Sequence, residues 1–287
     1  MIASQLHVET LGAPGPAGTL VFVHATGLNG LTYFPMLRRV AHDGEILVPT
    51  LRGHGADRLE ADPMKLKSWQ PLADDLAATL SERDYEPPLV LAGHSAGAVT
   101  ALLTARQLHA AHVLLIEPVV IPRWFVTLCN TPLRTAVTNR FKVAQQAAAR
   151  RSSFPSRAVA KSFYRPKAFF RDWEEAALDC YLSEGMTEIE GGVELSCTPA
   201  WESAMFKAQA HGFWPHLEAV LQSGTRVSIL GAERQSTFPN NQRGPAAVKG
   251  AIVDEVEGGH MLPLEKPELT ATWLTEQLNV DANSSRV

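Results

Sequence analysis

The sequence predicts an α/β fold with a doubly wound, mostly parallel sheet and an inserted helical cap. Short apolar runs of strand length recur along the chain, and segments with helical spacing lie between several of them. Strands that are apolar on both faces are typical of a parallel sheet covered by helices on both sides. Alternation of strand and helix implies right-handed crossovers. The six predicted strands are residues 19–24, 46–50, 89–92, 113–116, 227–230 and 251–256.

Helical spacing is clearest in two segments of the first half. Leu72, Leu76 and Leu80 recur with the period of one helical face, and Val99 and Leu102 do the same after a glycine-rich turn. Such spacing directs apolar side chains towards a common core. We therefore expect a helix in each segment, packed against the sheet.

The alternation breaks between residues 122 and 222. About a hundred residues separate two strands that one helix would normally join. Segments 133–151 and 172–182 have helical composition, and 191–197 reads as extended. A separate second domain is the alternative, but the chain returns to the strand pattern afterwards, which favours an insertion. The prediction is a core of residues 1–121 and 223–287 with a helical cap of residues 122–222.

Composition limits the partners of the protein. In 287 residues, 26 Lys and Arg stand against 30 Asp and Glu, a net charge of −4. Without a basic field, nucleic acid is an unsuitable partner. No apolar run approaches the length of a membrane span, and residues 1–13 lack the pattern of a signal peptide. Three widely spaced cysteines suggest reduced thiols. We expect a cytoplasmic protein that acts on a small molecule, with no membrane association.

The strongest motif is the pentapeptide Gly93-His94-Ser95-Ala96-Gly97. An apolar strand precedes it and a helical segment follows, which is the context of a nucleophile elbow. Small neighbours allow the sharp turn, and the hydroxyl projects at a helix N-terminus that favours negative charge. Ser95 is therefore the predicted nucleophile. His94 is expected to pack beside the elbow, because it is adjacent to the serine in sequence and points away from it.

A second loop, after the first predicted strand, supplies backbone amides at the same sheet edge. Acyl transfer needs two donors aimed at the oxyanion of the tetrahedral intermediate. The amides of Thr26 and Ala96 are the predicted pair. His24, at the end of the strand, is expected to hold this loop by hydrogen bonds and is not assigned a catalytic role.

The predicted base is His260. It follows the last strand through Gly258 and Gly259 and precedes the C-terminal helical segment. Glycines let a loop place the imidazole over the sheet edge, where a neutral ring could take the proton of Ser95 and return it to the leaving group. Its place in the chain, after the serine, is that of a hydrolase histidine.

Four motifs together resemble those of the α/β-hydrolase fold family: residues 93–97, 51–55, 24–27 and 258–265. The similarity spans nearly the whole chain except the cap. It implies hydrolysis through an acyl-enzyme without a cofactor or a metal, and a triad in the order Ser, acid, His. In that family residues 51–55 form a structural turn, so Arg52 and His54 receive no catalytic role. Ala25 departs from the family, which usually has glycine there.

The acid of the triad is the largest departure from the family. The family usually places it after the penultimate strand, and Gln235 stands there in this chain. An amide cannot stabilise an imidazolium as a carboxylate does. Glu117, at the end of the strand that follows the nucleophile helix, is the predicted acid, as in a subgroup that includes some haloalkane dehalogenases. An unpaired carboxylate there would be costly without a role. Glu233 is the alternative.

These residues predict an esterase, lactonase or thioesterase acting on a small to medium acyl compound. Hydrolysis of a carbon–carbon bond in a diketone is an alternative for the same residues, and a non-enzymatic ligand receptor is an alternative on the same fold. The oligomeric state and the substrate are left open, because the shape of the cap sets specificity. Large apolar residues of the cap and the histidine loop could line a pocket or fill the cap core: Trp124, Phe125, Trp201, Phe213, Trp214 and Met261.

Overall fold

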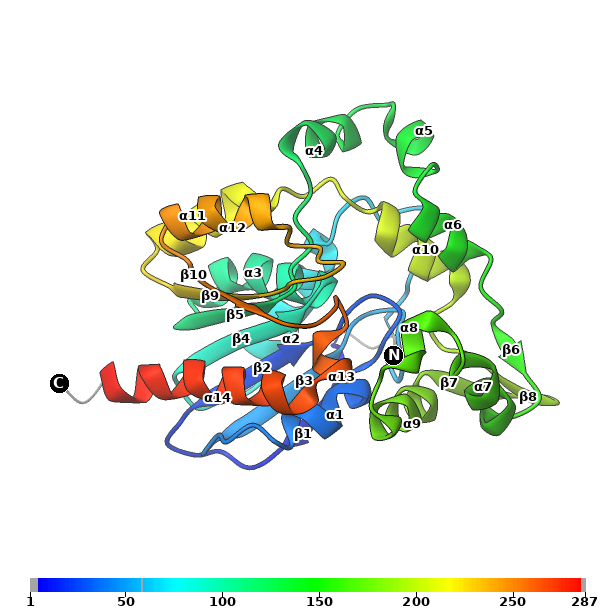
Figure 1. Cartoon of the computed structure of the whole chain (residues 1–287), viewed down its shortest axis with the longest axis horizontal. Coiled ribbons are helices and arrows are strands. Elements are labelled where there is room, and N and C mark those ends of the chain that lie inside the picture. The colour runs from blue at the N-terminus through cyan, green and yellow to red at the C-terminus, as the bar shows by residue number, and fades with distance from the viewer. Residues whose placement is uncertain (1–4, 58, 285–287) are drawn as a thin grey trace.

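A seven-stranded sheet forms the centre of the molecule (Figure 1). The computed structural model describes residues 5–57 and 59–284. The strand order is β1-β3-β2-β4-β5-β9-β10, in which only β1 runs antiparallel to its neighbour. The strands are β1 (His7–Leu11), β2 (Thr19–Val23), β3 (Glu45–Thr50), β4 (Leu89–His94), β5 (His112–Ile116), β9 (Arg226–Ala232) and β10 (Ile252–Val256). The predicted fold class is confirmed.

Each of the six predicted strands overlaps an observed one, and β1 is the strand of this sheet that the sequence did not predict. Its segment, HVETL, mixes polar and apolar residues and is partly exposed. It lies at the edge of the sheet, paired only with β3. An edge strand needs no continuous apolar run, because fewer of its side chains are buried.

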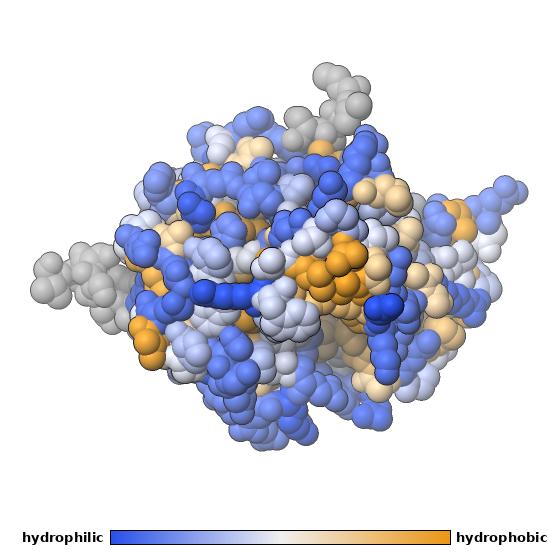
Figure 2. Space-filling view, turned by 90° about the horizontal axis from the view of Figure 1, so that it is seen from above, coloured by the Kyte–Doolittle hydropathy of each residue, from blue (hydrophilic) through white to orange (hydrophobic). Residues whose placement is uncertain are grey.

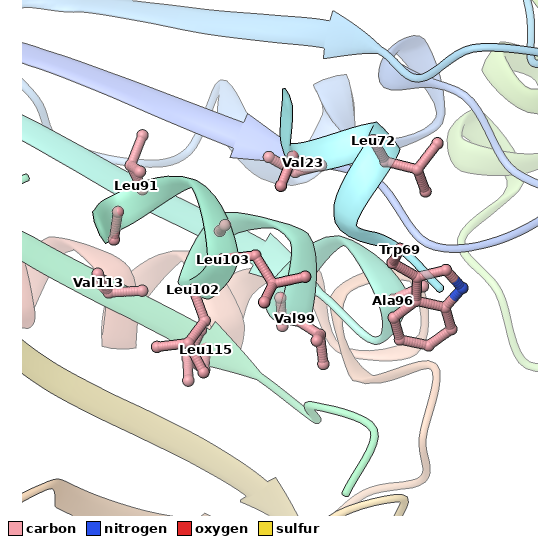
Figure 3. Close-up of a cluster of buried hydrophobic side chains, with 14 of the residues drawn as sticks. Val23, Trp69, Leu72, Leu91, Ala96, Val99, Leu102, Leu103, Val113 and Leu115 are labelled. Carbon is pink, nitrogen blue, oxygen red and sulfur yellow. The ribbon is translucent and has the colours of Figure 1, made fainter. Parts of the chain in front are cut away.

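Helices cover both faces of the sheet, and alternate strand residues point to opposite faces. Leu91 and Leu115 belong to one buried cluster, together with residues of α2 (Gln70–Ser81), α3 (Ala96–Leu108) and α11 (Phe213–Gln222). Figure 3 shows part of this cluster between α3 and the strands. Val90 and Leu114 belong to the cluster on the other face, with residues of α1 (Phe34–Leu37) and α14 (Pro267–Ser284). This alternation fixes the register of the central strands.

The segment between β5 and β9 forms seven helices before α11 and a small second sheet, strand order β6-β8-β7. In Figure 1 these elements lie beyond the end of the main sheet. The strands are β6 (Ser153–Phe154), β7 (Met186–Ile189) and β8 (Gly192–Leu195). The helices are α4 (Arg123–Cys129), α5 (Arg134–Thr138), α6 (Lys142–Ala148), α7 (Arg157–Tyr164), α8 (Ala168–Arg171), α9 (Glu175–Glu184) and α10 (Pro199–Lys207).

Three details of this segment differ from the sequence expectations. The helical segment 133–151 is two short helices, α5 and α6, and the helix expected from residue 172 begins later, as α9. The extended segment 191–197 contains β8, but the sheet around it was not predicted. Helix α11 lies within the range 122–222, yet it packs on α3 and β9 of the sheet layer. The division into core and cap stays a prediction.

Four further elements complete the chain: a short 3-10 helix, η1 (Gly30–Tyr33), α12 (Asn240–Val248), α13 (Leu262–Glu265) and the loop that carries His260. Within the described residues, every helix is too short or too polar to cross a membrane.

Candidate active site

Ser95 lies between the end of β4 and the first turn of α3. Its backbone has φ 57° and ψ −117°, a left-handed conformation that a non-glycine residue rarely adopts. The turn leaves no room for larger neighbours, since a Cβ at Gly97 would lie 2.2 Å from the Val23 carbonyl oxygen. The amide of Ser95 donates to the Ile116 carbonyl, 3.0 Å away on β5. The backbone of the serine is therefore tied to β5, while Gly97 lies close against β2.

His260 reaches the serine from the loop between β10 and α13. Its Nε2 lies 3.0 Å from the Ser95 hydroxyl oxygen. Its Nδ1 lies 3.1 Å from Oε2 of Glu117. Because a carboxylate can only accept, the ring proton lies on Nδ1, and Nε2 is left to accept from the serine hydroxyl. The structure thus brings the predicted nucleophile, base and acid into one hydrogen-bonded chain.

Glu117 directly follows β5 and is fully buried. Its φ of 47° is left-handed, which turns the side chain towards the histidine. Oε1 accepts from the amide of Ala232 at 2.6 Å and from the hydroxyl of Ser236 at 2.7 Å. Oε2 accepts from the amide of Thr237 at 3.0 Å and from His260. Four donors therefore replace the water that this carboxylate loses on burial.

Ser236 and Thr237 were missed by the sequence analysis. Both belong to the loop after β9, the place where the family usually carries its acid. The Thr237 hydroxyl donates to the Glu117 carbonyl oxygen at 2.8 Å, and its oxygen lies 3.2 Å from His260 Nδ1. The only sequence signal was their position next to Gln235. This loop supplies hydrogen-bond donors to the acid of the neighbouring strand.

Glu233 and Gln235, also in the loop after β9, make no hydrogen bond to Glu117 or His260. Glu233 is exposed, and no side-chain hydrogen bond or ion pair joins it to another described residue. Gln235 is also exposed, with φ 53°, and its amide has no partner among the described residues. Gln235 instead lines a cavity next to His260.

One predicted oxyanion donor directly follows the serine, and the other lies in the loop after β2, the strand that pairs with β4. Ala96 is the first residue of α3, where a helix leaves its amides without partners inside the helix. The amide of Thr26 donates to no acceptor within the described part of the chain. The next amide, Gly27, is already used, because it donates to His54 Nε2 at 3.1 Å. An oxyanion site requires two unpaired amides, and the loops that carry these two follow the paired strands β2 and β4.

Two buried histidines, His24 and His54, hold the loop after β2 that carries Thr26. His24 Nε2 accepts from the amide of Leu51 at 2.9 Å, and its Nδ1 donates to the Ala25 carbonyl. Burial, with a smaller contribution from His54, lowers the pKa of His24 to about 3. Burial likewise lowers the pKa of His54 to about 4. Both rings are neutral at physiological pH and keep fixed donor and acceptor nitrogens.

His94 links the elbow to the two neighbouring loops. Its Nε2 donates to the carbonyl of His260 at 2.8 Å, and its Nδ1 accepts from the hydroxyl of Tyr33, also at 2.8 Å. That hydroxyl in turn accepts from the amide of Ala25 at 3.2 Å. Burial, with His260 as the second cause, holds the pKa of His94 well below its usual range. From the sequence, only packing beside the elbow was predicted for His94, so these hydrogen bonds are new.

The chain also matches a known protein family. The model of the "Alpha/beta hydrolase family" matches residues 20–273. The chain therefore belongs to the alpha/beta hydrolase family and is a hydrolase enzyme. The "Magnesium-chelatase 30 kDa subunit" of Rhodobacter capsulatus is 29% identical over 149 residues, 48% of this chain and 51% of that protein. The chain thus spans about half the length of this curated relative.

Solved structures with the same fold cover nearly the whole chain. E-2-(acetamidomethylene)succinate hydrolase has a TM-score of 0.74 at 16% identity, covering 96% of this chain and 95% of that one. A peroxisomal alpha-beta-hydrolase from Saccharomyces cerevisiae also has a TM-score of 0.74, at 17% identity over 99% and 90%. A thioesterase domain from the curacin biosynthetic pathway has 0.73, at 17% identity over 94% of each chain. At these identities the likeness is one of fold.

Proposed function

We propose that this protein is a serine hydrolase that cleaves a carboxylic ester, lactone or thioester through an acyl-enzyme. One observation carries the proposal: Ser95, His260 and Glu117 form an unbroken chain of contacts of 3.0 and 3.1 Å. Geometry of this kind lets an imidazole activate a serine hydroxyl while a carboxylate fixes its tautomer. The thioesterase domain among the similar folds is consistent with acyl chemistry.

The first half of the reaction forms the acyl-enzyme. Ser95 Oγ attacks the carbonyl carbon of the substrate, and its proton passes to His260 Nε2. The carbonyl oxygen becomes an oxyanion, which the amides of Thr26 and Ala96 stabilise. When the carbonyl re-forms, the bond to the leaving group breaks, and the proton on Nε2 goes to that group. Glu117 stays ionised and stabilises the imidazolium meanwhile.

The second half returns the enzyme to its starting state. A water molecule gives one proton to His260 Nε2 and attacks the acyl carbon, so that a second oxyanion forms. Its collapse breaks the bond to Ser95 Oγ, which takes the proton back from Nε2. The products are a carboxylic acid and an alcohol or thiol, with no change of oxidation state. The chemistry needs no group beyond these residues and water.

We also propose that residues 122–222 include a cap that selects the substrate. Helix α8, from this segment, borders the cavity next to His260. Because α11 packs on the sheet layer, the substrate-covering part is expected to lie in α4–α10. Figure 2 shows orange hydrophobic residues gathered beside a hollow near the centre of the upper face.

Labelling with a fluorophosphonate tests the proposal. The intact chain should gain one adduct, located at Ser95 by mass spectrometry, and should turn over a p-nitrophenyl ester. Ser95→Ala should lose the adduct and at least about three orders of magnitude of kcat, with unchanged circular dichroism. Ser183→Ala, a change at an exposed serine, is the matched control. Half the original rate in Ser95→Ala would overturn the proposal.

A further inference from the structure

A cavity of about 430 Å³ lies next to His260. Helix α8 borders it with Phe169 and Arg171, and the loop after β9 borders it with Gln235 and Thr237. Ser95 is not one of the residues that line it. The cavity therefore borders the proposed base and not the nucleophile. Its volume is within the range that holds a small organic ligand.

The direction of proton transfer gives this cavity a role, on the basis of the proposed function. His260 must hand its proton to the departing oxygen or sulfur, so that atom has to lie within hydrogen-bond reach of Nε2. The acyl carbon is meanwhile bonded to Ser95. The rest of the leaving group can then extend past the histidine into a space that borders His260 and not Ser95.

Two side chains offer unused donors to this space. The amide of Gln235 is exposed and unpaired within the described residues. The one hydrogen bond of the Arg171 side chain joins Nε to Oδ1 of Asp172 at 3.5 Å, the limit of such a contact. Its two terminal nitrogens are therefore available. The ring of Phe169, 49% exposed, adds an apolar wall.

The charges around the cavity favour an uncharged ligand. Arg171 is one cation against the carboxylates of Asp172 and Glu265, which also line the space. Glu265 accepts from the amide of Gly259 at 3.3 Å, so it is partly occupied. An anionic ligand would meet two like charges, and a cation would lose the benefit of the Arg171 and Gln235 donors.

We infer that the cavity formed by α8 and the loop after β9 binds the leaving group, and that this group is an uncharged alcohol or thiol carrying a hydrogen-bond acceptor such as an amide carbonyl. Gln235 and Arg171 donate to that acceptor, and Phe169 contacts the apolar linker. Gln235 stands where the family usually has its acid, and in this chain it contributes to substrate selection. Simple alkyl esters of the same acyl group are poorer substrates.

Two thioesters of matched length test the inference. S-acetyl N-acetylcysteamine releases a thiol with an amide, and S-acetyl pentanethiol releases an apolar thiol of the same chain length. The wild-type protein should prefer the first in kcat/KM. Gln235→Met and Arg171→Met should each lower the ratio of the two kcat/KM values about fivefold, the effect of one hydrogen bond. Lengthening the acyl group from acetyl to hexanoyl should leave that drop in the ratio unchanged.

Matched controls make the same chemical changes outside the cavity. Gln222→Met, at the exposed end of α11, and Arg140→Met, an exposed residue between α5 and α6, should keep the wild-type ratio. The inference is wrong if the wild-type protein shows no preference, or if the Gln235 and Arg171 variants keep the preference. Failure of the proposed function is distinguishable, because then neither thioester is hydrolysed and no adduct forms at Ser95.

Discussion

Strands β5 and β9 lie side by side and end at the same edge of the sheet, but the carboxylates that follow them differ. Glu117, after β5, is fully buried and receives four hydrogen bonds. Glu233, after β9, is exposed, and no hydrogen bond joins its side chain to another described residue. Donors and burial therefore coincide at Glu117, the proposed acid. The loop after β9 does not supply the carboxylate, but Ser236 and Thr237 of this loop donate hydrogen bonds to Glu117.

The largest expected effect is at Glu117. Glu117→Gln keeps the shape but removes the charge that stabilises the imidazolium, so kcat on an activated ester should fall by about 10³ to 10⁴. Glu233→Gln, measured beside it, should stay within about twofold of the wild-type rate, since its side chain is exposed. Steady-state kinetics of the two purified variants provide the comparison. A severe loss at Glu233 with a normal rate at Glu117 would reverse the assignment.

A double variant tests whether a carboxylate at position 235, where the family usually has its acid, can replace Glu117. Glu117→Gln with Gln235→Glu should remain within about tenfold of the Glu117→Gln rate, because no hydrogen bond joins the side chain of Gln235 to His260 in the described residues. His260 Nδ1 instead lies near Glu117 and Thr237. Recovery to within tenfold of the wild-type rate would mean that the two loops are interchangeable.

A smaller effect is expected from the donors of the β9 loop. Ser236→Ala removes the hydroxyl that donates to Glu117 Oε1 at 2.7 Å. A hydrogen bond to a charged group contributes about 1.5 to 3 kcal/mol, so kcat should fall about tenfold or more with KM nearly unchanged. Ser236→Thr keeps a hydroxyl and should recover most of the rate. Ser223→Ala, a hydroxyl at the end of α11, should leave kcat unaffected.

An unchanged kcat in Ser236→Ala together with a raised KM would contradict this positioning role. It would mean that the serine contacts substrate and does not act through Glu117. Circular dichroism and the midpoint of urea unfolding separate either outcome from a general loss of stability.

The last prediction concerns stability in acid, and it compares Glu117 with buried groups that have no charged partner. His24 and His54 are buried without an opposite charge, and burial lowers their pKa values from 6.5 to about 3 and about 4. Between pH 6.5 and 4 the unfolded chain therefore binds protons that the folded chain does not. The free energy of unfolding should fall as the pH is lowered through this range, by up to about 2 kcal/mol for each histidine at pH 5.

Urea unfolding at pH 7 and pH 5 measures this loss. His54→Gln should reduce the difference between the two pH values by the share of that residue. His109→Asn, at an exposed left-handed position, should leave the difference unchanged. Equal free energies of unfolding at both pH values would show that these histidines do not govern acid stability.

The sequence by itself determined the fold and the family, because those signals are local. Continuous apolar runs, helical periodicity and the small residues around Ser95 depend on neighbours within a few positions of the chain. The prediction of Ser95 and His260 used the same kind of signal, a strand end followed by a glycine-rich loop. The edge strand β1 and the small sheet of β6, β7 and β8 lacked such patterns, since few of their side chains are buried.

Only the tertiary structure decided how the charged groups are paired. Glu117 and His260 are 143 positions apart in the chain, and Ser236 reaches Glu117 across 119 positions. The sequence favoured Glu117, which ends a central strand, but left Glu233 as an alternative, because both follow a strand at the same edge. Burial and the supply of donors distinguish them, and both arise only when β5 and β9 pair in parallel. The same holds for the cavity, whose walls come from α8 and from the loop after β9.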